Sequence, residues 1–232
     1  MGDAAVYGVE DGVDDAAGPM QRSCRVVAIR HGQTAWNAAQ RLQGHTDIAL
    51  DDTGAWQARQ MATALAAEGV TVIYSSDLLR AHHTALALAQ TTGAALHTDA
   101  GLRERHFGFL EGHTYIDIDQ RWPQDARSWR TRDVLAKPGG GESLLQFSNR
   151  CVGVSMQLAA RHPGGVVALV AHGGVLDCLY RAATGAALAD PRSWQLGNAT
   201  INRLLWTPQG FSLVGWNDDQ HLQQAERAQG LD

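Results

Sequence analysis

Apolar and polar positions alternate along this chain with two different periods, which predict strands and helices in turn. Residues 25–30 and 166–171 are nearly unbroken apolar runs rich in valine, which is typical of strands covered on both faces of a parallel sheet. Shorter runs at 70–74 and around Leu96 predict two more strands. The stretch 201–216 contains two apolar runs around Pro-Gln-Gly, which predicts a β-hairpin.

Amphipathic segments separate these strands and predict four helices, over about 52–68, 78–91, 143–161 and 175–183. Thr53 is expected to cap the first helix and Gly69 to end it. Ser75-Ser76-Asp77 is expected to cap the second, and Gly185 closes the last. Strands that alternate with helices in this way indicate an α/β fold.

The length of 232 residues suits one domain, which we place at residues 23–222. Residues 1–22 are acidic and rich in glycine and alanine, which predicts a disordered leader, and 223–232 is expected to be a C-terminal tail. Residues 106–142 lose clear periodicity and contain a proline followed by three glycines. Because long irregular segments in compact domains are usually binding loops, we expect this insertion to form a lid over a ligand pocket.

The charge pattern argues against polyanionic partners. The net charge is -5, and the 18 arginines and single lysine are spread along the chain, so neither a nucleic acid nor an anionic membrane is an expected partner. No apolar stretch is long enough to span a membrane and the first residues lack signal-peptide features, which predicts a cytoplasmic protein. The isolated Cys24, Cys151 and Cys178 are expected to be buried free thiols.

Both of the most apolar runs end in histidine followed by glycine: Arg30-His31 follows the first, and His172-Gly173 follows the second. Ligands of open α/β sheets bind outside the carboxyl ends of the strands, so both histidines are expected to face one pocket. Arg80 falls in the first turn of a predicted helix, where the dipole disfavours a cation unless an anion lies nearby.

These side chains suit a phosphoryl group. Guanidinium groups match phosphate oxygens with two hydrogen bonds at once, a neutral imidazole can attack phosphorus, and a second imidazole can donate to a non-bridging oxygen. For any one of these residues alone, an ordinary polar position at a sheet edge is an equal alternative. Further motifs in a fixed order therefore have to decide between the two interpretations.

Such motifs occur, and together they resemble the histidine phosphatase superfamily, also called the phosphoglycerate mutase-like family. The resemblance covers nearly everything from residue 25 to 217. Its motifs stand in this order: Ile29-Arg30-His31-Gly32 with Thr34 and Asn37, Gln43-Gly44 with Leu50 and Gly54, Ser75-Ser76-Asp77-Leu78 with Arg80-Ala81 and Thr84-Ala85, Leu102-Arg103-Glu104 with Gly108 and Glu111-Gly112, Gly141-Glu142-Ser143, and His172-Gly173. Motifs in this order are far more specific than a lone Arg-His-Gly.

The resemblance implies a three-layer α/β/α sandwich with a mostly parallel mixed sheet, and it implies roles for single residues. His31 would be the nucleophile that becomes a phosphohistidine. Arg30, Arg80 and His172 would hold the transferred phosphoryl group. Glu104 would protonate the leaving oxygen and later activate water.

Asn37 and Gln43 would add contacts to the phosphate or the substrate, and Gly173 is placed in the same binding site. No metal or other cofactor is expected, because the arginines supply the positive charge that Mg²⁺ supplies in other phosphoryl-transfer enzymes. The leaving alkoxide is a strong base, so its proton donor has to be a carboxylic acid kept protonated by partial burial and the nearby phosphate. Glu111 and Glu142 remain alternatives for that role.

Other candidates have plainer explanations. His82 and His83 lack a metal-binding pattern and are expected to be surface or packing residues of a helix. His106 and His113 border the insertion and suit either the substrate side or solvent. Four aromatic residues of the insertion are expected either to line the pocket beyond the phosphate or to form the core of the lid: Phe107, Phe109, Trp122 and Trp129.

We therefore expect a metal-independent phosphomonoester hydrolase that acts on a small soluble phosphate ester. Phosphoglycerate mutase is the alternative, because His106-Phe107-Gly108 resembles the mutases, although the insertion is short and its basic residues do not match the mutase pattern. A non-catalytic phosphate sensor is less expected, since a pure binder needs neither His31 nor Glu104. The sequence leaves open which ester is used and whether the chain forms a homodimer.

Overall fold

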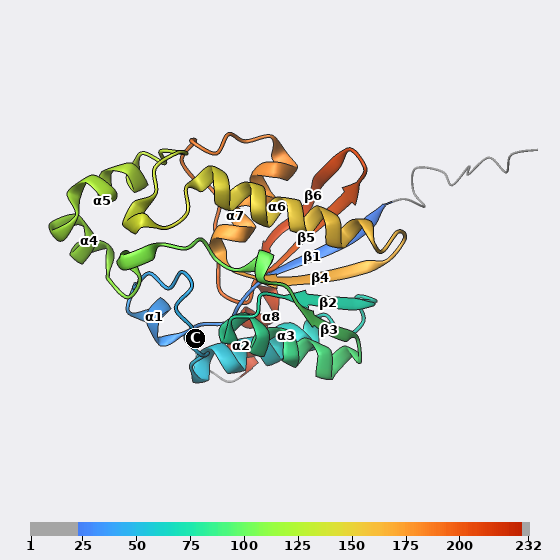
Figure 1. The fold of residues 1–232 in the computed structure, drawn as a ribbon. Coiled ribbons are helices and arrows are strands. Elements are labelled where there is room, and N and C mark those ends of the chain that lie inside the picture. Colours follow the sequence, from blue (N-terminus) through green and yellow to red (C-terminus); the bar gives the residue numbers. More distant parts are fainter. Residues whose placement is uncertain (1–22, 229–232) are drawn as a thin grey trace, which may run out of the picture.

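A computed structural model describes residues 23–228, and its centre is a six-stranded sheet in the order β3-β2-β4-β1-β5-β6 (Figure 1). Strands β1 to β4 pair in parallel, whereas β5 pairs antiparallel with β1, and β6 with β5. The predicted strands and hairpin are therefore confirmed, and so is a mixed, mostly parallel sheet. The strands are β1 (Cys24–Arg30), β2 (Val72–Ser75), β3 (Ala95–Thr98), β4 (Val166–Ala171), β5 (Ile201–Thr207) and β6 (Gly210–Asp218).

Helices cover both faces of this sheet, which confirms the three layers (Figure 1). Successive side chains of a strand point to opposite faces, and β1 shows the result. Val27 and Ile29 join the core under α2 and α3, whereas Val26 and Ala28 join the core under α6 and α7. The four covering helices are α2 (Asp52–Ala64), α3 (Leu79–Thr92), α6 (Leu144–Ala160) and α7 (Gly173–Thr184).

Two predicted helix caps are wrong, although both helices begin within one residue of the predicted positions. Asp51 and not Thr53 caps α2, because the Asp51 carboxylate accepts a hydrogen bond from the backbone N–H of Gly54 at 2.7 Å. The N-cap residue of α3, Leu78, makes no side-chain cap, and the Asp47 carboxylate accepts the backbone N–H of Leu79 at 2.7 Å instead. The serines at 75–76 bond within the preceding loop. Ser143 is the N-cap residue of α6, at the predicted start of that helix, and the predicted Gly185 ends α7.

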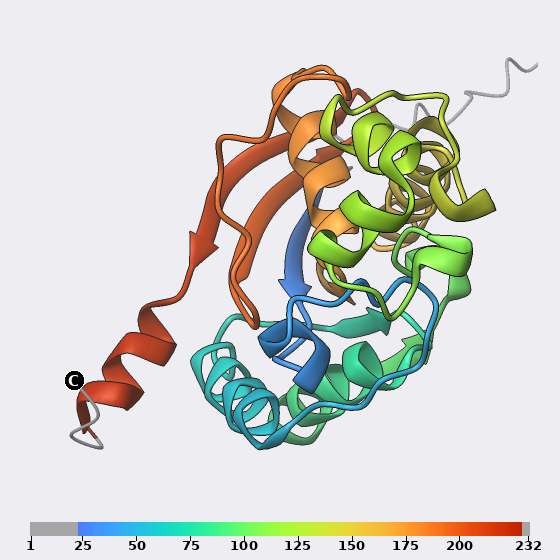
Figure 2. The same ribbon diagram turned by 90° about the vertical axis from the view of Figure 1, so that its left-hand side faces the viewer.

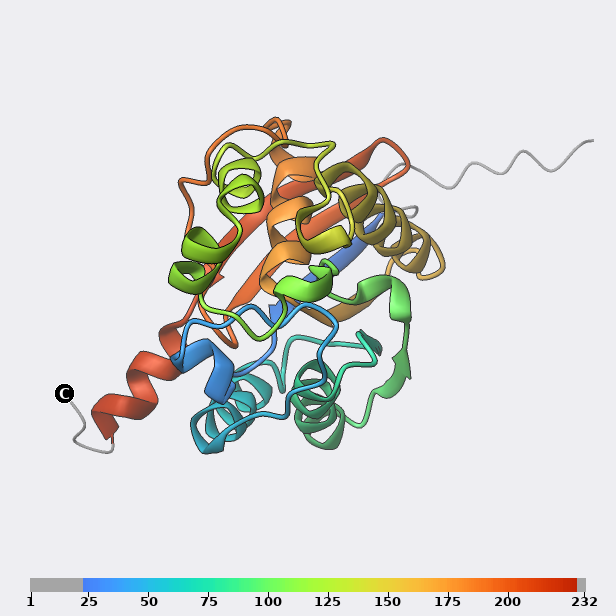
Figure 3. The same ribbon diagram turned by 60° about the vertical axis from the view of Figure 1, so that its left-hand side comes forward.

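The insertion is more regular than the sequence pattern predicts. It contains two short helices, which enclose a small apolar core of their own. The insertion lies against the loop that follows β1 (Figure 3), where the backbone N–H of Leu42 donates to the carbonyl of His113 at 3.0 Å. The helices are α4 (Tyr115–Arg121) and α5 (Pro123–Arg130).

The glycine run of the insertion is packed rather than free. Pro138–Gly140 forms the 3-10 turn η4, which contacts η3 (Gly108–Leu110). A Cβ added to Gly139 would lie 2.0 Å from the carbonyl oxygen of Phe107, so the two turns touch at their backbones. A third such turn, η2 (Ala100–Leu102), precedes the segment that carries Glu104.

Besides α4 and α5, two further helices have no counterpart in the prediction: the short α1 (Ala35–Ala38) and α8 (Gln220–Ala228), which occupies most of the expected tail. α8 contacts α2 and extends away from the sheet (Figure 2). The predicted leader at 1–22 and the last residues, 229–232, lie outside the described part of the chain. Within residues 23–228, no helix is both long and apolar enough to cross a membrane.

Candidate active site

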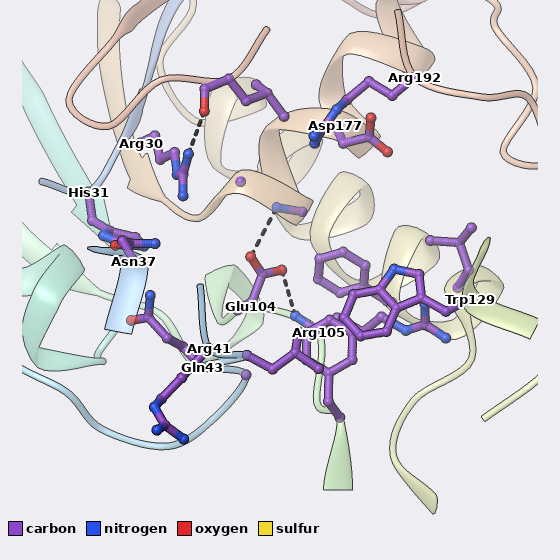
Figure 4. A pocket seen from close by; sticks show the side chains of 18 of the residues that line it. Arg30, His31, Asn37, Arg41, Gln43, Glu104, Arg105, Trp129, Asp177 and Arg192 are labelled. Atoms are coloured by element: carbon purple, nitrogen blue, oxygen red, sulfur yellow. Dashed lines mark hydrogen bonds between the residues drawn. The ribbon is translucent and has the colours of Figure 1, made fainter. Parts of the chain in front are cut away.

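A cavity of about 420 Å³ opens at the carboxyl ends of β1 and β4, where the sequence predicts the ligand site. Side chains from the N-terminal and C-terminal halves of the chain line the cavity. Asn37 and Gln43 lie on one side, Asp177 and Arg192 lie on the other, and Glu104 lies between them (Figure 4). Seven of the eight predicted site residues line it: Arg30, His31, Asn37, Gln43, Arg80, Glu104 and Gly173. The eighth, His172, is fully buried and packs against His31, with 5.2 Å between the ring centroids.

His31 is held in one tautomer by its own loop. Its Nδ1 lies 2.7 Å from the carbonyl oxygen of Gly32, which can only accept, so Nδ1 carries the proton and Nε2 keeps its lone pair. Burial, followed by the positive charges of Arg80 and Arg30, holds the pKa of His31 well below the usual 6.5. The ring is therefore neutral at neutral pH, as a nitrogen nucleophile must be.

His172 begins helix α7 as its N-cap residue and has no exposed surface. Burial and the charges of Arg80, His31 and Arg30 lower the pKa of His172 well below its usual value. Within residues 23–228, neither of its ring nitrogens has a hydrogen-bond partner. Buried polar atoms are rarely left unpaired, so these nitrogens fit an oxygen-rich ligand in the cavity.

Two guanidinium groups flank the histidines. The buried Arg80 donates to the backbone carbonyls of Gly44, at 2.8 Å, and Thr46, at 2.9 Å, and its Nε has no partner in the described chain. Burial lowers the pKa of Arg80 to about 10, so it stays charged at neutral pH. Arg30 donates to the carbonyl of Leu196, and its buried Nε is likewise unpaired in residues 23–228. Both groups suit an anion with several oxygens.

Glu104 reaches the cavity from the segment after η2. Its two carboxylate oxygens accept hydrogen bonds from the backbone N–H groups of Arg105, at 2.8 Å, and Gly174, at 3.0 Å (Figure 4). The other two candidate acids are engaged elsewhere and do not line the cavity. Glu142 pairs with Arg150, and Glu111 accepts backbone N–H groups of neighbouring loops.

Asn37 and Gln43 lie on the loop after β1. The side-chain carbonyl of Asn37 accepts the N–H of Thr34 at 3.1 Å and completes the capping box of α1, so this side chain is fixed in place. Gln43 is buried, and its Oε1 has no hydrogen-bond partner among the described residues.

Several lining residues escaped the sequence analysis: Arg41, Arg105, Tyr115, Arg132, Gly174, Asp177, Arg192 and Leu196. Arg105 follows Glu104 directly, and Asp177 stands one helical turn after Gly173-Gly174, so proximity to the motifs could have indicated these two. Gly174 and Arg41 also stand beside motifs, whereas Tyr115, Arg132, Arg192 and Leu196 come from separate loops and helices, for which the sequence carries no such signal.

The remaining aromatic and histidine candidates lie partly at the cavity and partly elsewhere. Of the four aromatic residues, Phe107 and Trp129 line the cavity, whereas Phe109 and Trp122 contact each other in the insertion. His83 is exposed on α3, as expected, and neither His106 nor His113 lines the cavity. Within residues 23–228, no group of three or more acidic, histidine or cysteine side chains could hold a metal ion. All three cysteines are free and buried, as predicted.

Comparison with known proteins supports the family resemblance. A family model described as histidine phosphatase superfamily (branch 1) matches residues 26–219. The metal-independent phosphoserine phosphatase of Arabidopsis thaliana is 36% identical over 200 residues, covering 85% of this chain and 82% of the relative. Phosphoglycerate mutase-like protein 4 of the same plant is 34% identical, covering 86% and 87%.

The likeness extends to solved structures. The structure of a mycobacterial glucosyl-3-phosphoglycerate phosphatase superimposes with a TM-score of 0.76 and 34% sequence identity, covering 85% of this chain and all of the other. These similar proteins share the fold and include both phosphatases and mutase-like proteins.

Proposed function

Because the chain belongs to branch 1 of the histidine phosphatase superfamily, we propose that it is a phosphomonoesterase that hydrolyses small phosphate esters through a phosphohistidine on His31. One observation carries the proposal: the neutral His31 ring shares a cavity with two cationic groups and a carboxyl group. This is the set that phosphoryl transfer to nitrogen requires.

In the first step, the Nε2 lone pair of His31 forms a bond to phosphorus while the bond from phosphorus to the ester oxygen breaks. The Arg30 and Arg80 guanidinium groups and the His172 ring bind the three non-bridging oxygens, where charge accumulates. Glu104 transfers its proton to the departing alkoxide, so the alcohol leaves neutral.

In the second step, the Glu104 carboxylate removes a proton from a water molecule as the water oxygen bonds to phosphorus. The bond from phosphorus to Nε2 breaks, and inorganic phosphate leaves. The hydrogen bond from Nδ1–H to the Gly32 carbonyl persists through both steps, so the ring returns to the same tautomer.

The cavity also indicates a second anionic group on the substrate. Arg41, Arg105 and Arg192 line it, and in residues 23–228 none of the three forms an ion pair. Backbone carbonyls orient the guanidinium groups of Arg41 and Arg105 but leave their charge unneutralised. We propose a carboxylate as the second group, because the substrates named for the similar phosphatases, phosphoserine and glucosyl-3-phosphoglycerate, carry one.

Phosphoglycerate mutase remains the second candidate, because one of the similar proteins carries a mutase-like name. A mutase has to protect its phosphohistidine from water, whereas a hydrolase admits water. An enolase-coupled assay primed with 2,3-bisphosphoglycerate separates them. We expect phosphate release to exceed any interconversion of 3- and 2-phosphoglycerate, and the opposite ratio would establish the mutase.

Covalent labelling tests the nucleophile. With a ³²P-labelled ester and a rapid quench in base, label should map to His31, and His31→Ala should lose both label and turnover because no other side chain replaces the imidazole. His83→Ala, a histidine exposed on α3, is the matched control and should label normally. Label on a serine or an aspartate would refute the mechanism.

A further inference from the structure

Asp177 lies on the face of α7 that borders the cavity. The helix begins at Gly173, and Gly173, Gly174 and Asp177 all line the cavity. Asp177 follows the two glycines by four and three residues, so it lies on the same face of the helix. Gly174 holds Glu104 through its backbone N–H, so Asp177 stands one turn, about 5 Å along the helix, from the contact that fixes the proposed proton donor. In Figure 4 it lies on the opposite side of the cavity from His31.

The two oxygens of Asp177 have different surroundings. Oδ2 accepts a hydrogen bond from Arg132 at 2.8 Å and another from Arg181 at 3.1 Å. Oδ1 is buried and has no partner among the described residues, in a side chain with only 7% of its surface exposed. A buried carboxylate oxygen without a donor is costly, and the soft terminal torsion of aspartate lets a ligand draw this oxygen toward the cavity. A carboxylate oxygen can only accept, so the ligand has to bring a donor.

Resting on the proposed function, we propose that Asp177 selects substrates that carry a free hydroxyl group on the carbon next to the phosphorylated carbon. Such a hydroxyl oxygen lies about 3 Å from the ester oxygen and reaches about 3 Å further through its hydrogen bond. Together these lengths span about 6 Å, somewhat more than the helical turn of about 5 Å between the Glu104 contact and Asp177, so such a hydroxyl group can reach the carboxylate.

The local charge favours a hydroxyl group over an ammonium group as this donor. Arg132 and Arg181 already neutralise the Asp177 carboxylate, and Arg105 and Arg192 line the same cavity. The two arginines beside Asp177 would repel an ammonium group at this position, whereas they would not repel a neutral hydroxyl group.

Three substrates test the proposal because they differ only in the substituent on the middle carbon. 3-Phosphoglycerate, phosphoserine and 3-phosphooxypropionate share the phosphate and the carboxylate, and carry hydroxyl, ammonium and hydrogen at the middle carbon. We expect kcat/KM for the hydroxyl compound to exceed that for the hydrogen compound by about tenfold or more, the usual effect of a hydrogen bond to a charged acceptor. The ammonium compound should do no better than the hydrogen compound. Equal kcat/KM values for the hydroxyl and hydrogen compounds, or a higher kcat/KM for the ammonium compound, would overturn the proposal.

Asp177→Ala should bring the hydroxyl-to-hydrogen ratio close to one, and a ratio that stays high would assign the selection to another residue. Asp190→Ala is the matched control, because it removes an exposed aspartate that does not line the cavity and should keep the wild-type preference. p-Nitrophenyl phosphate hydrolysis, measured in parallel, shows whether the phosphate site is intact. If the wild-type protein hydrolyses none of these esters, the proposed function fails, and the inference about Asp177 fails with it. If Asp177→Ala does not fold, the hydroxyl-to-hydrogen ratio of kcat/KM in the wild-type protein still tests the proposed preference.

Discussion

At the scale of single residues, the site keeps two imidazole rings neutral by burying them beside guanidinium groups. His31 and His172 are both buried, and Arg80 lowers the pKa of each. Two adjacent cationic rings would repel each other and the arginines, so the neutral state is the one that this packing favours. The same arginines that lower the pKa of the proposed nucleophile are placed to bind the phosphoryl oxygens.

The role of Glu104 can be tested through the leaving group. Glu104→Gln should lower the rate on alkyl phosphates by roughly 10²–10⁴-fold, because an amide cannot protonate the departing alkoxide. The loss should be much smaller with p-nitrophenyl phosphate, since nitrophenolate leaves without a proton. Steady-state kinetics on both esters measure the difference, and equal losses would show that Glu104 only binds or supports the fold.

Gly174 is expected to be as important as the carboxyl group that it holds. A Cβ at this position would lie 2.1 Å from Oε1 of Glu104 and 3.0 Å from the Phe147 ring. Gly174→Ala should therefore displace Glu104 and reproduce the leaving-group dependence of the Glu104→Gln variant. The control is Gly153→Ala on α6, where the added Cβ meets nothing within 4 Å, and this variant should keep full activity and gain up to about 1 kcal/mol of stability. Normal rates on alkyl phosphates for Gly174→Ala would contradict the assignment.

At the scale of elements, Glu111 joins the loop after β1 to the insertion. Its carboxylate accepts hydrogen bonds from the backbone N–H groups of His45, Thr46 and Phe107. Arg80 in turn donates to two carbonyls of this loop, so Glu111 supports the position of that guanidinium. A carboxyl group that the sequence offers as a proton donor thus serves to hold a loop.

Glu111→Ala should leave three backbone N–H groups without their acceptor. At about 1–3 kcal/mol for each unsatisfied group, the free energy of unfolding in urea should fall by about 3 kcal/mol or more. Vanadate should also inhibit more weakly, because the loop no longer fixes Arg80. Glu226→Ala, at an exposed position on α8, is the control and should change stability by less than about 0.5 kcal/mol. Unchanged inhibition by vanadate would show that the loop after β1 does not hold Arg80 in the phosphate site.

At the scale of the whole molecule, the buried histidines make stability depend on pH. The folded pKa values of His31 and His172 lie well below the ordinary 6.5, so the unfolded chain binds protons that the folded chain does not. The folded state is therefore fully favoured above about pH 6.5 and loses stability as the pH falls below it, by up to about 1.4 kcal/mol per pH unit for each group. The melting temperature should drop between pH 7 and 5.

The double variant His31→Gln, His172→Gln should flatten this dependence. Part of the slope should remain, because burial also lowers the pKa of His45 and His221. The Glu142 carboxyl group does not interfere in this window: its pKa is lowered, so its contribution is present above its ordinary 4.5 and is lost only at lower pH. The same slope in wild type and variant would refute the assignment to the two rings.

Much of this fold could be predicted because its signals are local. The apolar runs of β1 and β4 are buried on both faces and therefore show no alternation, and the histidine at each run's end is placed by the strand itself. The order of the motifs further predicted the site residues His31, Arg80, Glu104 and His172, which lie together in the structure. The helices of the insertion escaped because α4 and α5, with 7 and 8 residues, are too short to show a helical period.

The sequence by itself determined the elements of the sheet, the family and the residues at the strand ends, because each depends on neighbours along the chain. Only the tertiary structure decided that Arg132 and Arg192 join Arg30 and Arg80 at the cavity, since they come from separate segments. It also decided that Glu104 faces the cavity while Glu111 holds a loop, because both follow from contacts between distant parts of the chain. No local pattern encodes such contacts.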